Sequence, residues 1–273
     1  MLLFTLCFSF TFISCNEDEF LKTEPVDFYS PENSFITSAD YEAAVMNLYD
    51  RVRTEFFSND SQNDFPAAGI QATDVCYQHK NIGFTTDMGT VLLSTNEGLI
   101  YGALWGPAYR IIYDCNVIVE RAATDENELT ADEKSYFAAE AKFFRGYMYK
   151  MLANLYGRVP IVLEETKSPR RDFESAEREQ VYQQAAVDLK DAADNLDDID
   201  DVPDHRISRL AALHLLAEVY ISLEQWQNAV DAASAVINHP STELMTERFG
   251  SQVDDKAWPT QGNYDTNVFW DLF

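Results

Sequence analysis

The side chains best suited to binding chemistry are aromatic residues that stand near polar ones in segments without a regular period. Two such groups occur, Tyr77 near Asn81 and Phe84, and Trp258 near Tyr264. Sugars present apolar ring faces flanked by hydroxyl groups, so an exposed aromatic ring beside a polar side chain makes a carbohydrate platform. The candidate ligand contacts are therefore Tyr77, Asn81, Trp258 and Tyr264. Packing in the hydrophobic core is the alternative for each of them.

The sequence contains none of the common catalytic motifs. The nucleophile elbow GxSxG, the zinc motif HExxH, the phosphate-binding P-loop and the dinucleotide motif GxGxxG are all absent from the sequence. The histidines are far apart in the sequence, and the chain has no Cys-x-x-Cys pair of the kind that would suggest a zinc site. Carboxylate pairs for glycoside hydrolysis could be chosen at will from 46 acidic residues, so they carry no information. The sequence predicts a binding protein rather than an enzyme, with no catalytic residue, metal or cofactor.

The composition indicates a folded, acidic protein. The chain has 273 residues, which allows one or two ordinary domains, and its hydrophobic share of 46% excludes a disordered acidic polymer. The formal net charge of −26 argues against nucleic acid as a partner, because such binding depends on Lys and Arg neutralising phosphates. The same charge argues against electrostatic adsorption to anionic lipid.

The start of the chain has the pattern of an export signal. Residues 1–14 are uncharged and run into Cys15 and an acidic segment, 17–19. This stretch is shorter than the roughly 20 residues that a membrane span needs, but it suits the apolar region of a secretory signal. Residues 12–15 resemble the lipobox of bacterial lipoproteins, in which the cysteine receives fatty chains after cleavage. We expect a signal peptide over 1–14 and a lipidated tether over 15–34 that begins at Cys15; a mature N-terminal segment is the alternative.

Two cysteines lie beyond the predicted signal and anchor. They are Cys76 and Cys115. In an oxidising compartment they could form a disulfide, or each could remain a small buried hydrophobic residue. The sequence leaves both possibilities open.

Helical periodicity runs through most of the remaining chain. Residues 57–92 lack a sustained period and are interpreted as loops, and no long alternating runs predict an extensive β-sheet. Thr130 and Glu133 form a capping box. Gly106-Pro107 should either kink the second helix or mark its true start. The predicted helices begin near Ser38, run from about Glu97 to Ala123, from Thr130 to Tyr156 with Gly157 to Pro160 as the stop, and from about Ala176 to Leu196.

The last predicted helices, Ser208 to about Leu223 and Gln225 to Asn238, resemble a tetratricopeptide pair. The pair departs from the pattern at Glu224, where a turn glycine is usual. We expect its apolar residues to pack between helices, and we expect neighbouring helices to complete the stack, because such repeats need neighbours to bury their faces. The predicted fold is mainly all-α, a tetratricopeptide-like helical repeat scaffold with long irregular loops, in a domain over residues 35–273.

A longer pattern resembles a known family. The run AEAKFFRGYMY at 139–149, followed by NLYGRVPIV at 154–162, is similar to the signature of the SusD/RagB nutrient-binding lipoproteins. Gly146 stands where Ala is common. Further matches in the same order are Trp105, Tyr109, Ile112 and Asn116, then Val181-Tyr182, Asp188-Leu189 and Ala192, then Arg206 to Ser208 with Ala211-Ala212 and Leu215 to Ala217, and finally Trp270 to Leu272.

The resemblance implies a lipid-anchored protein of the cell outer membrane that faces outside. Such proteins sit over a TonB-dependent, SusC-like barrel transporter and deliver a nutrient to it, here a glycan in preference to a peptide. The acidic segment after Cys15 is similar to the export signal of surface lipoproteins. The segment at Trp270 lies midway through family members, so we expect a missing C-terminal half beyond Phe273, and a true start before Met1 because no basic residue precedes the apolar run.

The family's ligand residues vary between members, so none is carried over. Two other function classes remain open. A tetratricopeptide-like adaptor for envelope assembly should bind a protein rather than a soluble ligand. A secreted glycan hydrolase should turn its substrate over. The residues do not identify the ligand or its linkage.

Overall fold

The computed structural model of the protein describes residues 34–56, 104–203 and 205–243. Their elements belong to the unit Phe35–Phe273. The predicted signal peptide, Cys15 and most of the tether lie outside the described residues. The elements are α4 (Ser38–Phe56), α7 (Gly106–Ala123), α8 (Ala131–Tyr156), β1 (Val159–Pro160), β2 (Ser175–Ala176), α9 (Arg178–Asn195), α10 (Arg209–Ser222) and α11 (Trp226–Ile237). The predicted mainly helical fold is confirmed.

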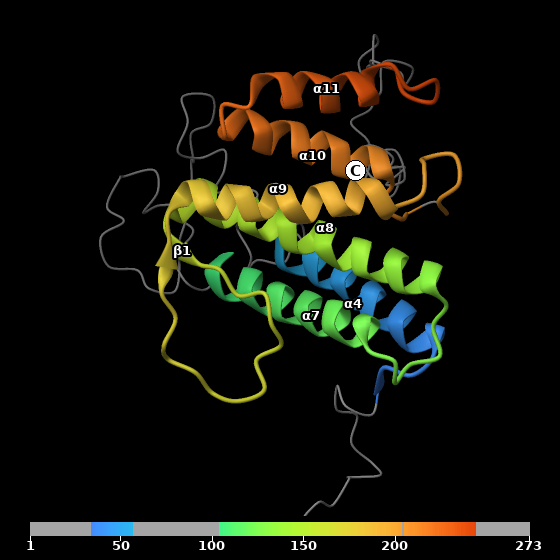
Figure 1. Cartoon of the computed structure of the whole chain (residues 1–273), viewed down its shortest axis with the longest axis vertical. Helices are drawn as coiled ribbons and strands as arrows, with labels where there is room; N and C mark the ends of the chain where they lie inside the picture. Colours follow the sequence, from blue (N-terminus) through green and yellow to red (C-terminus); the bar gives the residue numbers. More distant parts are fainter. Residues whose placement is uncertain (1–33, 57–103, 204, 244–273) are drawn as a thin grey trace, which may run out of the picture. The chain divides into compact units, whose positions relative to one another are not determined.

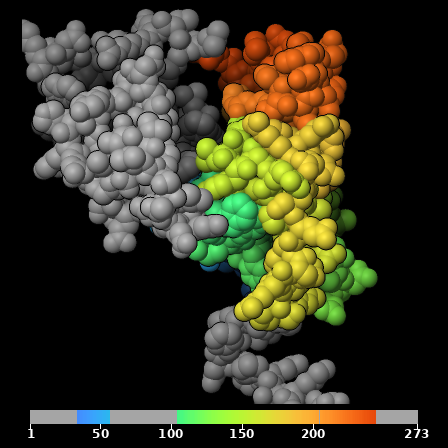
Figure 2. Space-filling view, turned by 90° about the vertical axis from the view of Figure 1, so that its left-hand side faces the viewer, coloured from blue at the N-terminus to red at the C-terminus, as the bar shows by residue number. Residues whose placement is uncertain are grey.

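The helices pack in layers around α8. Helix α9 lies between α8 and α10, α11 packs on α10, and α4 and α7 pack on α8 and on each other (Figure 1). The space-filling view shows the orange atoms of α10 and α11 next to the yellow atoms that include α9 (Figure 2). Strands β1 and β2 form a short antiparallel pair, with Val159 opposite Ala176 and Pro160 opposite Ser175. This pair closes the loop of residues 161–174, which we call the 161–174 loop.

Helix α8 begins and ends where its sequence predicts. The Glu133 amide donates to the Thr130 hydroxyl over 3.2 Å, and the Thr130 amide donates back to the Glu133 carboxylate over 2.9 Å. Gly157 ends the helix at a φ of 74° and a ψ of −92°, a conformation that suits glycine. Buried residues surround α8 because helices pack on several of its sides, whereas Leu155, near its end, is 60% exposed.

Helix α7 is bounded by Gly106 and Ala123, and Leu104 and Trp105 directly before it are also helical, with Trp105 at a φ of −56° and a ψ of −54°. Whether Gly106-Pro107 starts or kinks a longer helix depends on residues 97–103, which lie outside the described residues. Proline suits the first helical turn because the amide it lacks has no partner there. The apolar stripe of this helix is buried, and it consists of Leu104, Ala108, Ile111, Cys115, Ile118 and Ala122. Cys115 within it is a fully buried free thiol, so the structure supports the buried-residue alternative over a disulfide. Cys76 lies outside the described residues.

The pair α10–α11 forms the predicted helix–turn–helix unit, but not all of its apolar residues pack between helices. Leu216 is buried, whereas Trp226 is 60% exposed and Val230 is 56% exposed. The prediction was wrong for these two and for Ile237, which is 70% exposed, because they lie on the side of α11 that faces away from α10 within the described residues. Glu224, at the turn, holds a φ of 57°, the left-handed conformation that the usual glycine adopts freely.

Within the described ranges, every helix is too short or too polar to cross a membrane.

Candidate functional site

The ligand contacts chosen from the sequence lie outside the described residues. Tyr77 and Asn81 fall in the range 57–103, and Trp258 and Tyr264 fall in 244–273. Their roles, like that of Cys15, stay predictions. The described part of the chain offers a separate candidate site.

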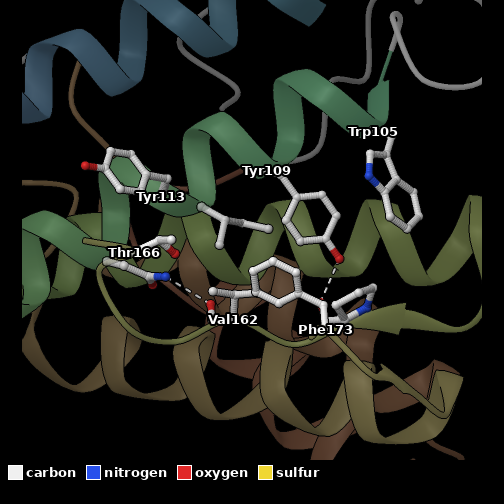
Figure 3. A pocket seen from close by; sticks show the side chains of 9 residues that line it. Trp105, Tyr109, Tyr113, Val162, Thr166 and Phe173 are labelled. Atoms are coloured by element: carbon white, nitrogen blue, oxygen red, sulfur yellow. Dashed lines mark hydrogen bonds between the residues drawn. The ribbon is translucent and has the colours of Figure 1, made fainter. Parts of the chain in front are cut away.

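This site is a cavity of about 290 Å³ between α7 and the 161–174 loop, which we call the α7 cavity. Its lining is mostly apolar and includes four aromatic rings. Figure 3 shows side chains of α7 on one side of the cavity and Val162 and Phe173 on the other. The described residues that line it are Trp105, Tyr109, Ile112, Tyr113, Asn116, Pro160, Val162, Thr166 and Phe173.

The aromatic rings form both a wall and an accessible surface. Trp105, directly before α7, and Tyr109 and Tyr113 of α7 are spaced four residues apart, so they lie on the same face of successive turns. The Trp105 ring lies 5.1 Å from that of Tyr109 and meets the ring of Tyr156 edge-on, also at 5.1 Å. Tyr113 is 38% exposed and Phe173 is 43% exposed. These two rings can therefore contact a ligand that enters the cavity.

Hydrogen bonds from α7 hold the opposite wall in place. The Tyr109 hydroxyl donates to the Pro160 carbonyl oxygen over 2.6 Å. The Asn116 side-chain amide donates to the carbonyl oxygens of Val162 and Glu164 over 3.0 and 3.2 Å. Burial raises the pKa of Tyr109, so its hydroxyl remains a donor at neutral pH. The cavity is thus largely pre-formed, as small-molecule sites usually are.

A second, more polar hollow of about 490 Å³ lies against the same loop. Pro160, Val162 and Phe173 line both hollows, so the two are adjacent. Arg170 donates to Asp172 over 3.0 Å, and its guanidinium lies 5.1 Å from the centre of the Phe173 ring. The hydrogen bonds from Arg170 lower the pKa of Asp172. An exposed aromatic ring therefore stands beside a charged, hydrogen-bonding pair.

This arrangement suits the binding of a ring that has one apolar face and several hydroxyl groups. Tyr113 and Phe173 offer apolar faces, while Thr166, Arg170 and Asp172 offer polar atoms nearby. No cluster of three or more His, Cys, Asp or Glu side chains that could hold a metal ion occurs within residues 34–56, 104–203 and 205–243.

Sequence reasoning did not identify this cavity. In the sequence, Trp105, Tyr109 and Asn116 stand out only as part of a family pattern, and nothing marks Phe173. The four-residue spacing of aromatic residues ahead of Asn116 is a signal that could have marked the α7 side. The loop side could not be found in this way, because only the fold brings Phe173 to α7.

Comparison with known proteins identifies relatives along most of the chain. A family model, SusD-like, with the description "Starch-binding associating with outer membrane", matches residues 19–221. Two relatives come from Formosa agariphila. SusD-like protein P2 is 27% identical over 242 residues, which cover 84% of this chain and 44% of the relative. SusD-like protein P25 is 22% identical over 280 residues, covering 96% of this chain and 49% of the relative. The chain spans about half the length of these relatives.

Solved structures of the same kind share the fold. A SusD-like carbohydrate binding protein from Bacteroides vulgatus aligns with a TM-score of 0.66 at 22% identity, over 78% of this chain and 47% of that one. A laminarin binding SusD-like protein aligns with a TM-score of 0.60 at 24% identity, over 74% of this chain and 44% of that one. These neighbours confirm the predicted tetratricopeptide-like helical scaffold.

Proposed function

The chain belongs to the SusD-like family, and on that basis we propose that it binds a glycan in the α7 cavity at the cell surface and delivers it to a transporter. The family is described as starch-binding and associated with the outer membrane. One structural neighbour is a laminarin binding protein, and another is a carbohydrate binding protein. A glycan is therefore a better candidate than a peptide.

The observation that carries the proposal is the pair of accessible rings, Tyr113 and Phe173, on the lining of one pre-formed cavity. A pyranose ring can cover an aromatic face while its hydroxyl groups reach Arg170 and Asp172 in the adjacent hollow. Among the described residues that line the α7 cavity, none is an acid, a histidine or a cysteine. Acids do line the adjacent hollow, among them Asp172, so the proposal of binding without turnover rests on the family rather than on the lining.

The proposed location and partner rest on sequence. Cys15 follows an uncharged run that resembles a lipoprotein signal, and lipidation there anchors the protein in the outer membrane, facing outside. In that position it passes the glycan to a TonB-dependent, SusC-like barrel transporter. The family description, with its association with the outer membrane, supports this location.

One observation favours a second function, that of an adaptor in envelope assembly. Trp226, Val230 and Ile237 of α11 are each more than half exposed. Apolar side chains that gather on one helix can bind a partner protein. An adaptor binds through this helix and leaves glycans unbound, so the glycan experiment separates the two functions.

The experiment has two arms. In the first, intact cells are treated with protease, and wild type is compared with Cys15→Ala and with Cys7→Ala, a matched control within the predicted signal. We expect wild type and Cys7→Ala to be cleaved from outside, and Cys15→Ala to be released or retained inside. Protection of wild type together with no effect of Cys15→Ala would contradict the anchor.

In the second arm, the purified protein is screened against neutral oligosaccharides that include starch and laminarin fragments. We expect saturable binding without release of shorter products. Product release would instead support a hydrolase. Absence of binding to any glycan, with capture of an envelope protein that Trp226→Ala abolishes, would support the adaptor.

A further inference from the structure

Asn116 connects the wall of the α7 cavity to the centre of the helical scaffold. It is fully buried, and its amide nitrogen faces the carbonyl oxygens of Val162 and Glu164. Its amide oxygen accepts a hydrogen bond of 2.8 Å from Arg145 of α8. A single side chain thus holds the 161–174 loop on one side and contacts a buried charge on the other.

Arg145 is in turn fixed by Asp188 of α9. Its Nε and Nη2 donate to the two carboxylate oxygens of Asp188 over 2.8 and 2.6 Å. Arg145 is 5% exposed and Asp188 is 1% exposed. Gln184 also donates to Asp188, over 3.2 Å. A two-point ion pair in a buried setting allows little movement of the guanidinium, because any displacement leaves a buried charge unpaired.

The direction of these bonds determines how the Asn116 amide is turned. An arginine has only donors, so the group that faces Arg145 must be the amide oxygen of Asn116. The amide nitrogen must then face the loop, where two carbonyl oxygens accept from it. A flipped amide would place donor against donor and acceptor against acceptor at both ends.

The geometry points to Arg145, held by Asp188, as a positioning residue for the cavity wall: it orients Asn116, which holds Val162 and Glu164 against α7. We call this chain of contacts, Asp188 to Arg145 to Asn116, the relay. The inference deepens the proposed function, because it identifies what sets the shape of the proposed glycan site. Of the three relay residues, Asn116 lines the cavity, whereas Arg145 and Asp188 do not.

A neighbouring contact acts on the same point of the loop. The Tyr149 hydroxyl accepts from the Val162 amide over 2.7 Å and donates to the Val162 carbonyl oxygen over 2.8 Å. Tyr149 lies one turn after Arg145 on α8, so both reach the loop from the same helix. Because the Val162 amide is hydrogen-bonded only while the loop is seated, its hydrogen exchange reports on whether the wall is in place.

The test is Asn116→Asp in the whole chain. The aspartate keeps an acceptor for Arg145 but has no amide hydrogen to donate to the loop. We expect exchange in the segment 159–166 to accelerate about tenfold or more, which corresponds to about 1.4 kcal/mol. We also expect the dissociation constant for the best-bound neutral oligosaccharide to rise by a similar factor.

The matched control is Tyr49→Phe, which removes a buried hydroxyl that donates to Glu140 over 2.9 Å and accepts from the Ile207 amide over 2.9 Å. These partners lie outside the loop. When Tyr49→Phe lowers the melting temperature as much as Asn116→Asp does, it should still leave the hydrogen exchange of residues 159–166 and the glycan affinity unchanged. A second variant, Arg145→Lys, keeps a positive charge for Asp188 but loses the planar fork, and should change exchange and affinity in the same direction as Asn116→Asp.

The outcomes are distinguishable. The relay is supported if hydrogen exchange of residues 159–166 accelerates in both Asn116→Asp and Arg145→Lys but stays at the wild-type rate in Tyr49→Phe. Exchange that follows global stability in all three variants would overturn it, because the relay then contributes only to folding. Faster exchange with unchanged glycan affinity would also overturn its role in the site. If wild type binds no glycan, the proposed function fails, and the exchange measurement alone still decides whether the relay positions the wall.

Discussion

Gly146 of α8 lies so close to Leu189 of α9 that a Cβ atom added to the glycine would stand 2.8 Å from the Leu189 Cγ atom. The same Cβ would stand 3.1 Å from the carbonyl oxygen of Ala185. The absence of a side chain therefore lets α8 and α9 approach closely, directly beside the Arg145–Asp188 ion pair. This explains the glycine at a position where the family resemblance leads one to expect alanine.

Gly146→Ala should destabilise the protein, although alanine favours a helix by about 1 kcal/mol. The added methyl group meets a backbone oxygen, and overpacking of this kind costs about 1–3 kcal/mol. We expect a net loss of about 1 kcal/mol or more in urea unfolding. Ser135→Ala, at an exposed position on the same helix, is the control and should be neutral or slightly stabilising. A Gly146→Ala protein more stable than wild type would show that the helices separate at little cost.

Substitutions at two turn residues should change the free energy of unfolding in opposite directions. Glu224 holds a φ of 57° and is exposed, so Glu224→Gly should stabilise the protein by about 0.5–1 kcal/mol through relief of backbone strain. Gly157 holds a φ of 74°, and an added Cβ would have no atom within 4 Å, so Gly157→Ala should cost about 1 kcal/mol or more because of backbone strain alone. Urea unfolding of both variants measures this. If both variants gained stability, or both lost it, the explanation from backbone conformation would be contradicted.

Glu140 predicts a specific dependence of stability on pH. Burial raises its pKa to about 7, although Arg206 and Tyr49 donate hydrogen bonds that partly offset the effect. Between about 4.5, its ordinary value, and about 7, the folded protein binds more protons than the unfolded chain. The contribution of Glu140 to stability therefore falls as pH rises through this window, by roughly 1–3 kcal/mol.

Glu140→Gln isolates this contribution from that of the other carboxylates. The variant leaves Arg206 paired with Glu42 and resembles the protonated form of Glu140, so near pH 5 its stability should be close to that of wild type. As pH rises from about 5 to about 8, the unfolding free energy of wild type should fall relative to that of the variant. A wild-type protein that does not lose stability relative to the variant over this range would show that Glu140 remains ionised in the fold.

Cys115 should be unreactive in the folded protein. It is fully buried, and burial raises the pKa of its thiol well above the ordinary value, which disfavours the nucleophilic thiolate. We expect iodoacetamide to modify the Cys115 peptide only after denaturation, as read by mass spectrometry. Rapid labelling of native protein, or a peptide linked to Cys76 by a disulfide, would contradict the structure.

The parts of the fold that depend on neighbouring residues in the sequence could be predicted. Thr130 and Glu133 identify the start of α8, and Gly157 identifies its end, because capping uses contacts within a few residues. The exposure of Trp226 and Leu155 could not be predicted in this way, since a helical stripe shows that a face is apolar but not which helices cover it.

The cavity depends on contacts between distant parts of the chain. Tyr109 holds β1 and Asn116 holds the loop through backbone carbonyl oxygens, which every residue has, so no side chain on that side marks the pairing in the sequence. The relay is similar. Arg145, Asp188 and Asn116 each stand out in the family pattern, but only the fold shows that they touch.

The measurement that tests the account most directly is the calorimetric affinity of the Tyr113→Ala/Phe173→Ala double variant for the best-bound neutral oligosaccharide. Both rings are partly exposed, so the melting temperature should hardly change, whereas the dissociation constant should rise tenfold or more, about 1.4 kcal/mol. Val187→Ala, at a position on α9 that is 62% exposed, is the control and should bind like wild type. A double variant with wild-type affinity would show that the glycan binds elsewhere and would contradict the α7 cavity as the site.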